Sequence, residues 1–401
     1  MSQYREILRI SGLTPLIVSQ LVARAPGGML TITLIMHAEH IFGSYALAGL
    51  VIAATSVGAA IAGPVTSRWM STWGMRQVLL LTIAIYSATL LLMALVVTPF
   101  PAYALGGLLL GAANPPIQSA VRTIYPKLAT ARQLPAVFSL DASLQEIIWV
   151  LGPMLAAMIA TQFGPPAAML VAGLLALIGT IWFVAQPSVG SVRIPRSPRR
   201  LGSVLAKPPV MYMIIVGFTM IGICGAVEAA TVAALDSEGI AAGLVLGAYS
   251  LGSFSGGLMF GSARVTSWSL VRRLTIVFLG TAAASVFMNA WWIGLMLLLS
   301  GLGIAPALGL LYTYISSSVR FSDTAEAYGW LGTGQLIGSA LGAAAAGFAV
   351  DAAGAQAAFG VATAIAAVTV VLAVVARRKL PDLSDGAIGP LPDTAPTPVV
   401  G

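Results

Sequence analysis

Charged residues are scarce in this chain. They make up 8% of its 401 residues, whereas 58% are hydrophobic. A soluble domain carries about 25% charged residues, because water must wet its surface. So few charges cannot cover a water-exposed surface, and we expect lipid to be the solvent for most of the protein. The length suffices for about twelve membrane-spanning helices with short loops, and it leaves no room for a large soluble domain.

Cysteine, histidine and lysine are almost absent. The single cysteine, Cys224, excludes an internal disulfide and a cysteine-based metal cluster. His37, Glu39 and His40 form the one group that could suggest a metal site, with a pH-sensing gate as the alternative. They lack a fourth ligand and lie at the end of a predicted helix, where a solvated loop is expected. We therefore predict no metal and no cofactor.

A Walker-type loop is missing as well, and no nucleotide-binding domain fits into the chain. We therefore do not expect this chain alone to drive transport with ATP. What the chain has in abundance is apolar segments of membrane-spanning length, separated by short polar breaks or by breaks with proline and glycine. These segments predict an all-α integral membrane protein with twelve transmembrane helices in two pseudo-symmetric bundles of six.

The first apolar segment is interpreted as a transmembrane helix and not as a cleaved signal. Arg5 and Arg9 precede it, and no small-residue cleavage site follows a short apolar core. The predicted helices cover residues 12–36, 45–66, 77–97, 102–121, 136–160, 166–186, 210–235, 241–262, 274–291, 293–316, 327–350 and 356–376.

The distribution of basic residues predicts the orientation. If both termini lie in the cytoplasm, all Lys and Arg residues except Arg24 fall in cytoplasmic segments. Cytoplasmic loops hold an excess of these residues because they resist translocation. We therefore predict a multi-pass protein of the cytoplasmic (cell) membrane with both termini inside. This orientation also explains the net charge of +7, so nucleic acid is not an expected partner.

Two segments differ from the apolar helices. Residues 187–208 are basic and rich in proline, which predicts a cytoplasmic linker between an N-terminal bundle, residues 1–186, and a C-terminal bundle, residues 209–380. Residues 381–401 lack periodic hydrophobicity, which predicts a disordered cytoplasmic tail. We expect the protein to be a monomer.

The two halves resemble each other in sequence. Residues 48–51 recur as residues 242–245, and at a slightly smaller offset Pro116 corresponds to Pro306. Chance matches are frequent in helices rich in alanine and glycine, but these and further pairs are collinear within a six-plus-six topology. One large class of transporters uses parallel repeats of six helices to build a midplane site between two halves.

The loop after the second predicted helix carries a family signature. In the major facilitator superfamily this loop reads Gly-x-x-x-Asp-Arg-x-Gly-Arg-Arg, and the chain resembles it with Gly63, Arg68, Gly74 and Arg76. Ser67 replaces the aspartate, and the spacing to the second glycine is longer. The resemblance extends over residues 10–378 and implies the transporter fold of that family, without the charge relay assigned to the aspartate.

A second motif lies in the fifth predicted helix. Gly152 and Pro153 match the Gly-Pro centre of the family's antiporter signature, while Ala156 replaces a later glycine. The chain is thus similar to the efflux-type branch of the superfamily.

A few charges lie inside predicted helices, where they cost at least ~2.5–3.5 kcal/mol each and usually pair or line a wet cavity. They are Arg24, next to residues 26–28 (Pro-Gly-Gly), then Asp141, Glu146 and Glu228. The residues of 26–28 are expected to loosen their helix. Our hypothesis is that Glu146 titrates with protons and that Arg24 is its partner or binds an anion. The alternative is a fixed structural ion pair of Arg24 with Glu146 or Asp141. Asp141 lies near the cytoplasmic end, where we expect a solvated role.

Prolines interrupt corresponding helices of the two halves. Asn114 and Pro116 lie in the fourth predicted helix, and Pro306 lies in the tenth. Proline removes a backbone donor and kinks a helix, which can expose carbonyl groups to a cavity. The alternative is a purely structural bend.

The leading hypothesis is secondary active transport of a small solute, with proton-coupled efflux by alternating access ahead of proton-linked uptake of a metabolite. An integral-membrane enzyme would need catalytic groups clustered at one depth, and only the group around His37 offers them, so we expect no enzyme. A non-transporting sensor or scaffold on the same fold is the third alternative. The expected partners are a small-molecule substrate, protons and the lipid bilayer.

Overall fold

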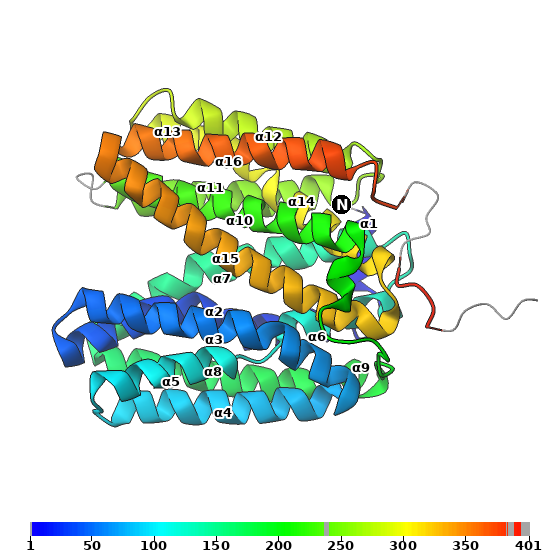
Figure 1. The fold of residues 1–401 in the computed structure, drawn as a ribbon, viewed down its shortest axis with the longest axis horizontal. Coiled ribbons are helices and arrows are strands. Elements are labelled where there is room, and N and C mark those ends of the chain that lie inside the picture. Colours follow the sequence, from blue (N-terminus) through cyan, green and yellow to red (C-terminus); the bar gives the residue numbers. More distant parts are fainter. Residues whose placement is uncertain (1, 236–239, 382, 384–388, 394–401) are drawn as a thin grey trace, which may run out of the picture.

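The computed structural model describes residues 2–235, 240–381, 383 and 389–393. These residues form α-helices, one short 3₁₀ helix and one isolated β-bridge, and no strand occurs among them. The fold of the described chain is therefore all-α, as the sequence predicts (Figure 1).

The helices fall into two halves joined by a linker. The N-terminal half contains α1 (Ser2–Leu8), α2 (Leu13–Phe42), α3 (Tyr45–Thr72), α4 (Met75–Leu95), α5 (Phe100–Ala112), α6 (Ile117–Leu128), α7 (Leu134–Phe163) and α8 (Pro165–Ala185). The linker contains α9 (Pro187–Ser191) and the 3₁₀ helix η1 (Ser203–Ala206). The C-terminal half contains α10 (Pro208–Ala234), α11 (Ala241–Phe260), α12 (Ser269–Ala284), α13 (Ala290–Gly301), α14 (Ile304–Ser318), α15 (Phe321–Ala353) and α16 (Ala355–Ala376).

Ten segments among the described residues are long and apolar enough to cross a membrane, with α13 and α14 together forming one of them. The other two predicted spans differ from uninterrupted membrane helices. Residues 113–116 separate α5 from α6, and α12 has 16 residues. Pro115 and Pro116 account for the first break, because proline lacks an N–H donor and clashes with the preceding turn.

The second half repeats the order of the first. An interrupted helix, α5–α6 or α13–α14, precedes a long helix in each half, α7 with 30 residues or α15 with 33. Each long helix then turns into the last helix of its half at a glycine, Gly164 or Gly354, with φ of 89° and 79°. This left-handed backbone is open to glycine at no steric cost. The offset in sequence between Gly164 and Gly354 equals the offset between Pro116 and Pro306.

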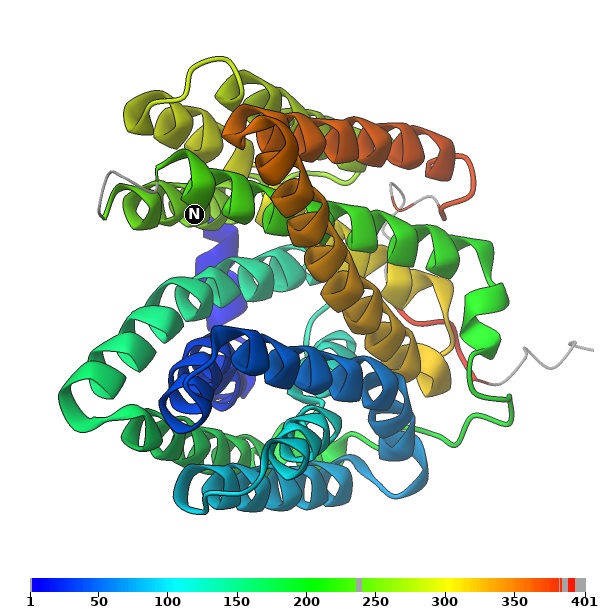
Figure 2. The ribbon, with the colours of Figure 1, turned by 60° about the vertical axis from the view of Figure 1, so that its left-hand side comes forward.

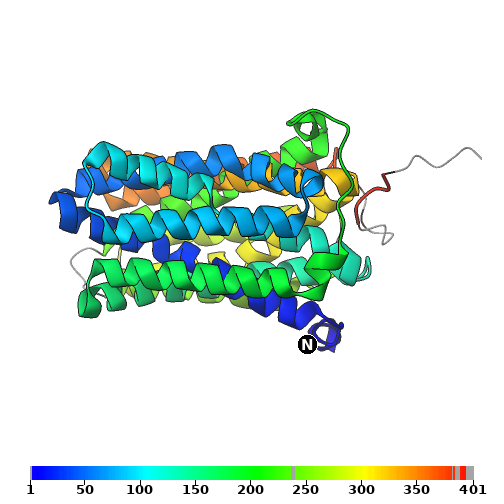
Figure 3. The ribbon, with the colours of Figure 1, turned by 90° about the horizontal axis from the view of Figure 1, so that it is seen from below.

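One end of the helix bundle collects the basic residues. We call it the basic end: α2, α7, α10 and α15 begin there, on the right-hand side of Figure 1. Except for Arg24 and Arg122, which lie within helices α2 and α6, the Lys and Arg residues lie in the segments near this end. The side view in Figure 3 shows α1 and the linker at the same end. The other end is called the opposite end below.

The two halves share a core only near the basic end. One cluster of buried apolar side chains joins Leu16, Val121 and Phe138 of the N-terminal half to the helices of the C-terminal half. At the opposite end the N-terminal half has a separate core, which includes Leu34 and Ile83. Figure 2 shows α7 and α15 running between the halves. The halves are therefore packed together at one end and have independent cores at the other.

The linker and the described part of the tail cover the basic end. Ser197 and Arg199 of the linker bond the carboxylate of Asp323 at 2.6 and 3.1 Å. Leu391 pairs with the backbone on either side of Arg320, donating to Val319 and accepting from Phe321. The prediction of a disordered tail is therefore wrong for residues 389–393, and most of the remaining tail lies outside the described residues.

Candidate functional site

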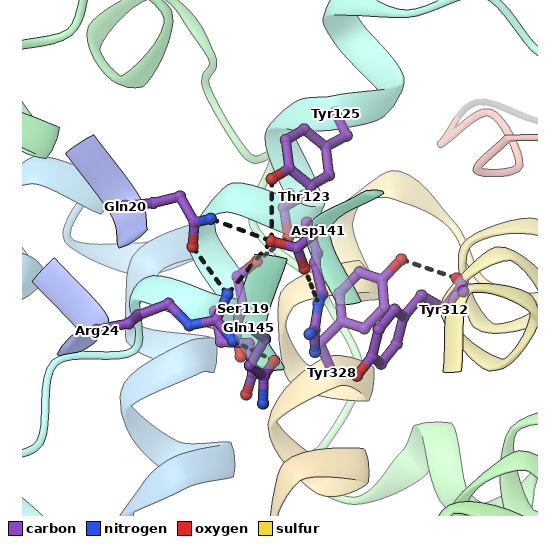
Figure 4. Close-up of polar contacts among 12 residues, drawn as sticks. Gln20, Arg24, Ser119, Thr123, Tyr125, Asp141, Gln145, Tyr312 and Tyr328 are labelled. Atoms are coloured by element: carbon purple, nitrogen blue, oxygen red, sulfur yellow. Dashed lines mark hydrogen bonds and ion pairs between the residues drawn. The ribbon is translucent and has the colours of Figure 1, made fainter. Parts of the chain in front are cut away.

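A polar cluster lies inside the N-terminal half, where three helices each present a charged residue and a glutamine four positions apart. The pairs are Gln20 and Arg24 on α2, Gln118 and Arg122 on α6, and Asp141 and Gln145 on α7. Side chains four positions apart share a helix face. Figure 4 shows the side chains of the α2 pair directed toward Asp141.

Asp141 is the centre of this cluster. It is fully buried and accepts four hydrogen bonds. Its Oδ1 accepts from Gln20, Arg24 and Tyr125, each at 3.2 Å. Its Oδ2 accepts from Nε of Arg122 at 3.1 Å. A buried carboxylate is tolerated when it is paired and hydrogen-bonded, so Asp141 is held as a fixed anion.

This geometry corrects two expectations from the sequence. Arg24 pairs with Asp141 and donates to Gln145 and, at 2.8 Å, to Gln20, so its partner is not Glu146. Asp141 is not solvated, because side chains of α2 and α6 enclose its carboxylate. The helix α2 also continues through residues 26–28 without a break, so the expected loosening is absent there.

Arg122 extends the cluster toward the C-terminal half. Its side chain is buried, and its guanidinium lies 3.5 Å from the ring centroid of Tyr312 on α14. The hydroxyl of Tyr328 on α15 donates to the carbonyl of Tyr312 at 2.9 Å. With its amide turned to satisfy the surrounding donors, Gln118 accepts from Nη2 of Arg24 at 3.0 Å and from Nη2 of Arg122 at 2.9 Å. Both guanidinium groups therefore converge on one neutral oxygen.

Glu146 belongs to a different contact. It lies on α7 beyond Asp141 and accepts a hydrogen bond from Oγ of Ser253 on α11 at 2.7 Å. The same hydroxyl accepts from the backbone N–H of Ala305, where α14 begins, at 3.2 Å. Along α7, Glu146 is the last residue with a hydrogen bond to the C-terminal half among the described residues. This carboxylate thus joins the two halves inside the bundle, as Thr333 of α15 does by donating to the carbonyl of Ala60 on α3 at 2.8 Å.

Glu228 on α10 has an exposed side chain and no hydrogen-bond or ion-pair partner within the described chain. Cys224 lies one turn before it, with its thiol 3.7 Å from the hydroxyl of Tyr249 on α11.

The signature loop forms contacts across the basic end. Arg68 on α3 forms an ion pair with Glu326 on α15 and donates to the backbone carbonyl of Arg199 in the linker. Gly329 of α15 lies directly against the backbone of Gly63 and Pro64, leaving no room for a side chain. A close approach of this kind requires glycine.

Two further residues of the signature loop remain within the N-terminal half. Gly74 precedes α4 with a φ of 97°, and Arg76 donates to the carbonyl of Gln186 at 3.4 Å. Ser67, which stands in place of the family's aspartate, donates to Ser119 at 3.0 Å. The loop thus contributes packing at the basic end, and Arg68 alone carries its charge to the other half.

The antiporter-like motif is a packing contact between α7 and α2. A side chain at Gly152 would meet the Cα of Gly28 at 2.7 Å, and one at Gly28 would meet the carbonyl of Ile148 at 2.3 Å. These two glycines bring α2, which carries Arg24, against α7, which carries Asp141. Pro153 lies inside α7 without interrupting it.

The proline positions differ from the expected cavity lining. Asn114 is exposed and Pro116 is half-buried in the segment that separates α5 from α6. Pro306 is buried, and its carbonyl accepts from Arg273 at 2.6 Å. Pro306 therefore does not line a cavity, because its carbonyl is already satisfied and its side chain is packed.

The histidine group does not assemble. His37 is buried and shares a hydrogen bond of 2.9 Å with the carbonyl of Met93, while His40 is exposed. The expected solvated position is therefore wrong for His37. No group of three or more His, Cys, Asp and Glu residues that could hold a metal occurs in the described ranges.

Arg122 was assigned to a loop, because the fourth predicted helix ended at residue 121. Gln118 lies inside that predicted helix but was not singled out. The signal was present: a charged residue and a glutamine recur four positions apart in three apolar helices. That spacing indicates one polar face on each helix.

Comparisons with known proteins agree with this architecture. A family model described as Major Facilitator Superfamily matches residues 16–321. An MFS-type transporter, y4rN of Sinorhizobium fredii, is 27% identical over 172 residues, which are 41% of this chain and 42% of that protein. The match thus spans about two fifths of that relative's length.

Three solved structures have similar folds. The human organic anion transporter MFSD10 aligns with a TM-score of 0.71 and 16% identity over 90% of this chain and 98% of its own. A bacterial homologue of the iron transporter ferroportin, in an outward-facing state, aligns with 0.71 and 15% over 91% and 99%. The fucose:proton symporter FucP of E. coli aligns with 0.66 and 12% over 91% and 98%.

Proposed function

This chain belongs to the major facilitator superfamily, and we propose that it exports a small solute across the cytoplasmic membrane in exchange for protons. As a member it is a multi-pass membrane transporter and not an enzyme. The direction and the exchange for protons go beyond family membership. A motif in α7 supports the direction, and the contact between the two halves supports the exchange for protons.

Alternating access accounts for the arrangement of the cores. The halves share buried apolar side chains near the basic end, while the opposite end of the N-terminal half has its own core. Two such units can rock against each other around a central site without losing their separate cores. Because basic loops stay in the cytoplasm, the packed end is assigned to the cytoplasmic side, with both termini there. The structure then corresponds to a state that is closed toward the cytoplasm.

The observation that carries the proposal is the hydrogen bond from Ser253 to Glu146 across the halves. A hydrogen bond to a charged carboxylate is about twice as strong as a neutral one. Protonation of Glu146 therefore weakens a contact that holds the cytoplasmic side closed, and loss of the proton restores it. Because charges inside the membrane are costly, a lone carboxylate at this depth is a site for proton exchange.

Export is the proposed direction because Gly152 and Pro153 occupy the place of the antiporter motif in α7. The similar structures do not select the solute, because they are an organic anion transporter, a bacterial homologue of an iron transporter and a fucose:proton symporter. At 12–16% identity they support the fold alone. The solute class therefore has to come from the residues of this chain.

The test uses purified full-length protein in liposomes that contain a pH-sensitive dye. A small pH gradient is imposed, and cationic, neutral and anionic solutes are added one at a time. We expect at least one solute to trigger proton flux with the wild type and a loss of that flux with Glu146→Gln. Asp351→Asn is the matched control, because it removes an exposed carboxylate at the end of α15.

The outcomes separate the alternatives. If Glu146→Gln couples solute to proton as the wild type does, Glu146 is structural and the proposed coupling is wrong. If solute moves only together with protons into the vesicle interior, the protein is an uptake symporter. If no solute moves protons with any variant, a sensor on the transporter fold is the better description.

A further inference from the structure

We propose that Arg24 and Arg122 form a binding site for the carboxylate of a small organic anion, at the position that the side-chain amide of Gln118 occupies in this structure. The inference deepens the proposed function and rests on it, because it names the class of solute that the transporter would carry.

The buried cluster carries more positive than negative charge. Arg24 and Arg122 both form their ion pair with Asp141, and neither pairs with a second carboxylate within the described chain. Two positive charges therefore share one negative charge. Buried charge without a partner is costly, so the cluster gains by taking up one more anion.

Both guanidinium groups point at one terminal atom of the Gln118 side chain, which in the orientation drawn is the nitrogen that donates to Gln145 at 3.1 Å. With the amide turned, this atom is an oxygen that accepts from Nη2 of Arg24 at 3.0 Å and from Nη2 of Arg122 at 2.9 Å. A neutral amide oxygen is the weaker acceptor for two cations, because hydrogen bonds between ionised groups are shorter and stronger. A carboxylate at this point would accept from both arginines and would balance the excess charge.

The cluster is more accessible on one side than on the other. Asp141 is fully buried, whereas Gln118 and Gln145 are half-buried and the side chain of Arg24 is 11% exposed. The edge of the cluster that bears Gln118 is thus its more accessible side. Gln118 is the second residue of α6, directly after the interruption between α5 and α6. Its side chain therefore starts from the first turn of α6 and can rotate away.

The site also reaches the contact between the halves. The guanidinium of Arg122 lies on the ring of Tyr312, which belongs to α14 of the C-terminal half. Neutralising Arg122 changes the strength of this cation–π contact. Anion binding is thereby linked to the packing of one half on the other, as a transported solute requires.

Gln118→Glu tests the proposal, because it places a carboxylate in the proposed position with almost no change of shape. The full-length protein is purified in detergent, and its thermal unfolding is followed with increasing acetate or benzoate. Benzamide and benzylamine serve as the neutral and cationic counterparts of benzoate. Gln118→Ala removes the amide without adding charge, and Gln356→Glu makes the same exchange at a distant, exposed position.

We expect the carboxylates, but not benzamide or benzylamine, to raise the melting temperature of the wild type, Gln118→Ala and Gln356→Glu. Gln118→Glu should unfold at a higher temperature without any added anion and should lose affinity for benzoate at least about tenfold. The proposal is overturned if neither carboxylate stabilises the wild type, if benzamide stabilises it equally, or if Gln118→Glu responds like the wild type.

Failure of this inference and failure of the proposed function are distinguishable. If benzamide or benzylamine drives proton flux that depends on Glu146, the proton-coupled transporter stands and the anion site is wrong. If benzoate binds at Gln118 but no solute drives flux that depends on Glu146, the anion site stands and the proposed coupling is wrong.

Discussion

Asp141 and Glu146 lie on the same helix, α7, but their surroundings are opposite. Asp141 is fully buried inside the N-terminal half and accepts from two arginines, a glutamine and a tyrosine. Glu146 reaches across to the other half and accepts one hydrogen bond from the hydroxyl of Ser253. The same chemical group is thus fixed at one position and weakly held at the other.

The difference indicates a division of work. A buried carboxylate with two cationic partners cannot be removed without leaving the arginines unpaired. A carboxylate whose partners are serine hydroxyls leaves no buried cation unpaired when it takes up a proton. Asp141 therefore fixes the structure of the N-terminal half, and Glu146 can change the contact between the halves. Substitutions at these carboxylates and at their neighbours distinguish the two roles.

Asp141→Asn has the largest expected effect. It leaves Arg24 and Arg122 buried without their shared counter-charge, which should lower the free energy of unfolding by ~3–5 kcal/mol. Glu146→Gln, the matched change on the same helix, should cost less than about 1 kcal/mol. Thermal and denaturant unfolding of the two purified variants measures both. Equal losses of stability would show that the two carboxylates do not differ in the way described.

Glu326→Gln has the second largest effect. Glu326 forms an ion pair with Arg68 and accepts from the backbone N–H of Gly202 at 2.7 Å, so it joins α15 to the other half and to the linker. Its loss should weaken the basic end by ~1–3 kcal/mol. Because the contact lies between the halves, we expect cysteine probes at the basic end to become more accessible, with a nearly unchanged unfolding temperature. An unfolding loss as large as that of Asp141→Asn would contradict this.

Tyr125→Phe has the smallest effect of the three. It removes one of the four donors to Asp141 and leaves both arginines in place. The free energy of unfolding should fall by ~1 kcal/mol, and proton-coupled flux should stay within about threefold of the wild type. A loss of flux comparable to that of Glu146→Gln would mean that the cluster around Asp141 takes part in proton coupling.

The membrane helices and the presence of charges within them could be predicted from the sequence, because apolar length and buried charge are properties of single segments. Arg24 and Glu146 were recognised in this way. The choice between Glu146 and Asp141 as the partner of Arg24 could not be made from the sequence, because pairing depends on how each helix is rotated. At ~100° per residue, Asp141 and Glu146 point about 140° apart around α7, so only one of them can face α2.

Arg122 shows a second limit of the sequence. Its helix restarts after the proline break and continues to Leu128, which keeps Arg122 inside the bundle. The kink at Asn114 and Pro116 was predicted, but the helix after it was expected to end at residue 121 and continues to Leu128. Tertiary packing against α7 and α14 supplies the partners that make a buried arginine possible here.

The account depends most on Glu146 as the group whose protonation changes the contact between the halves. Phe163, at the end of α7, and Leu244, near the start of α11, are both exposed at the opposite end and belong to different halves. Spin labels on Phe163→Cys and Leu244→Cys, in a background with Cys224→Ala, report the distance between them by electron paramagnetic resonance. We predict that acidic buffer shortens this distance in the wild-type background and leaves it unchanged with Glu146→Gln. The same shortening in both would contradict the account.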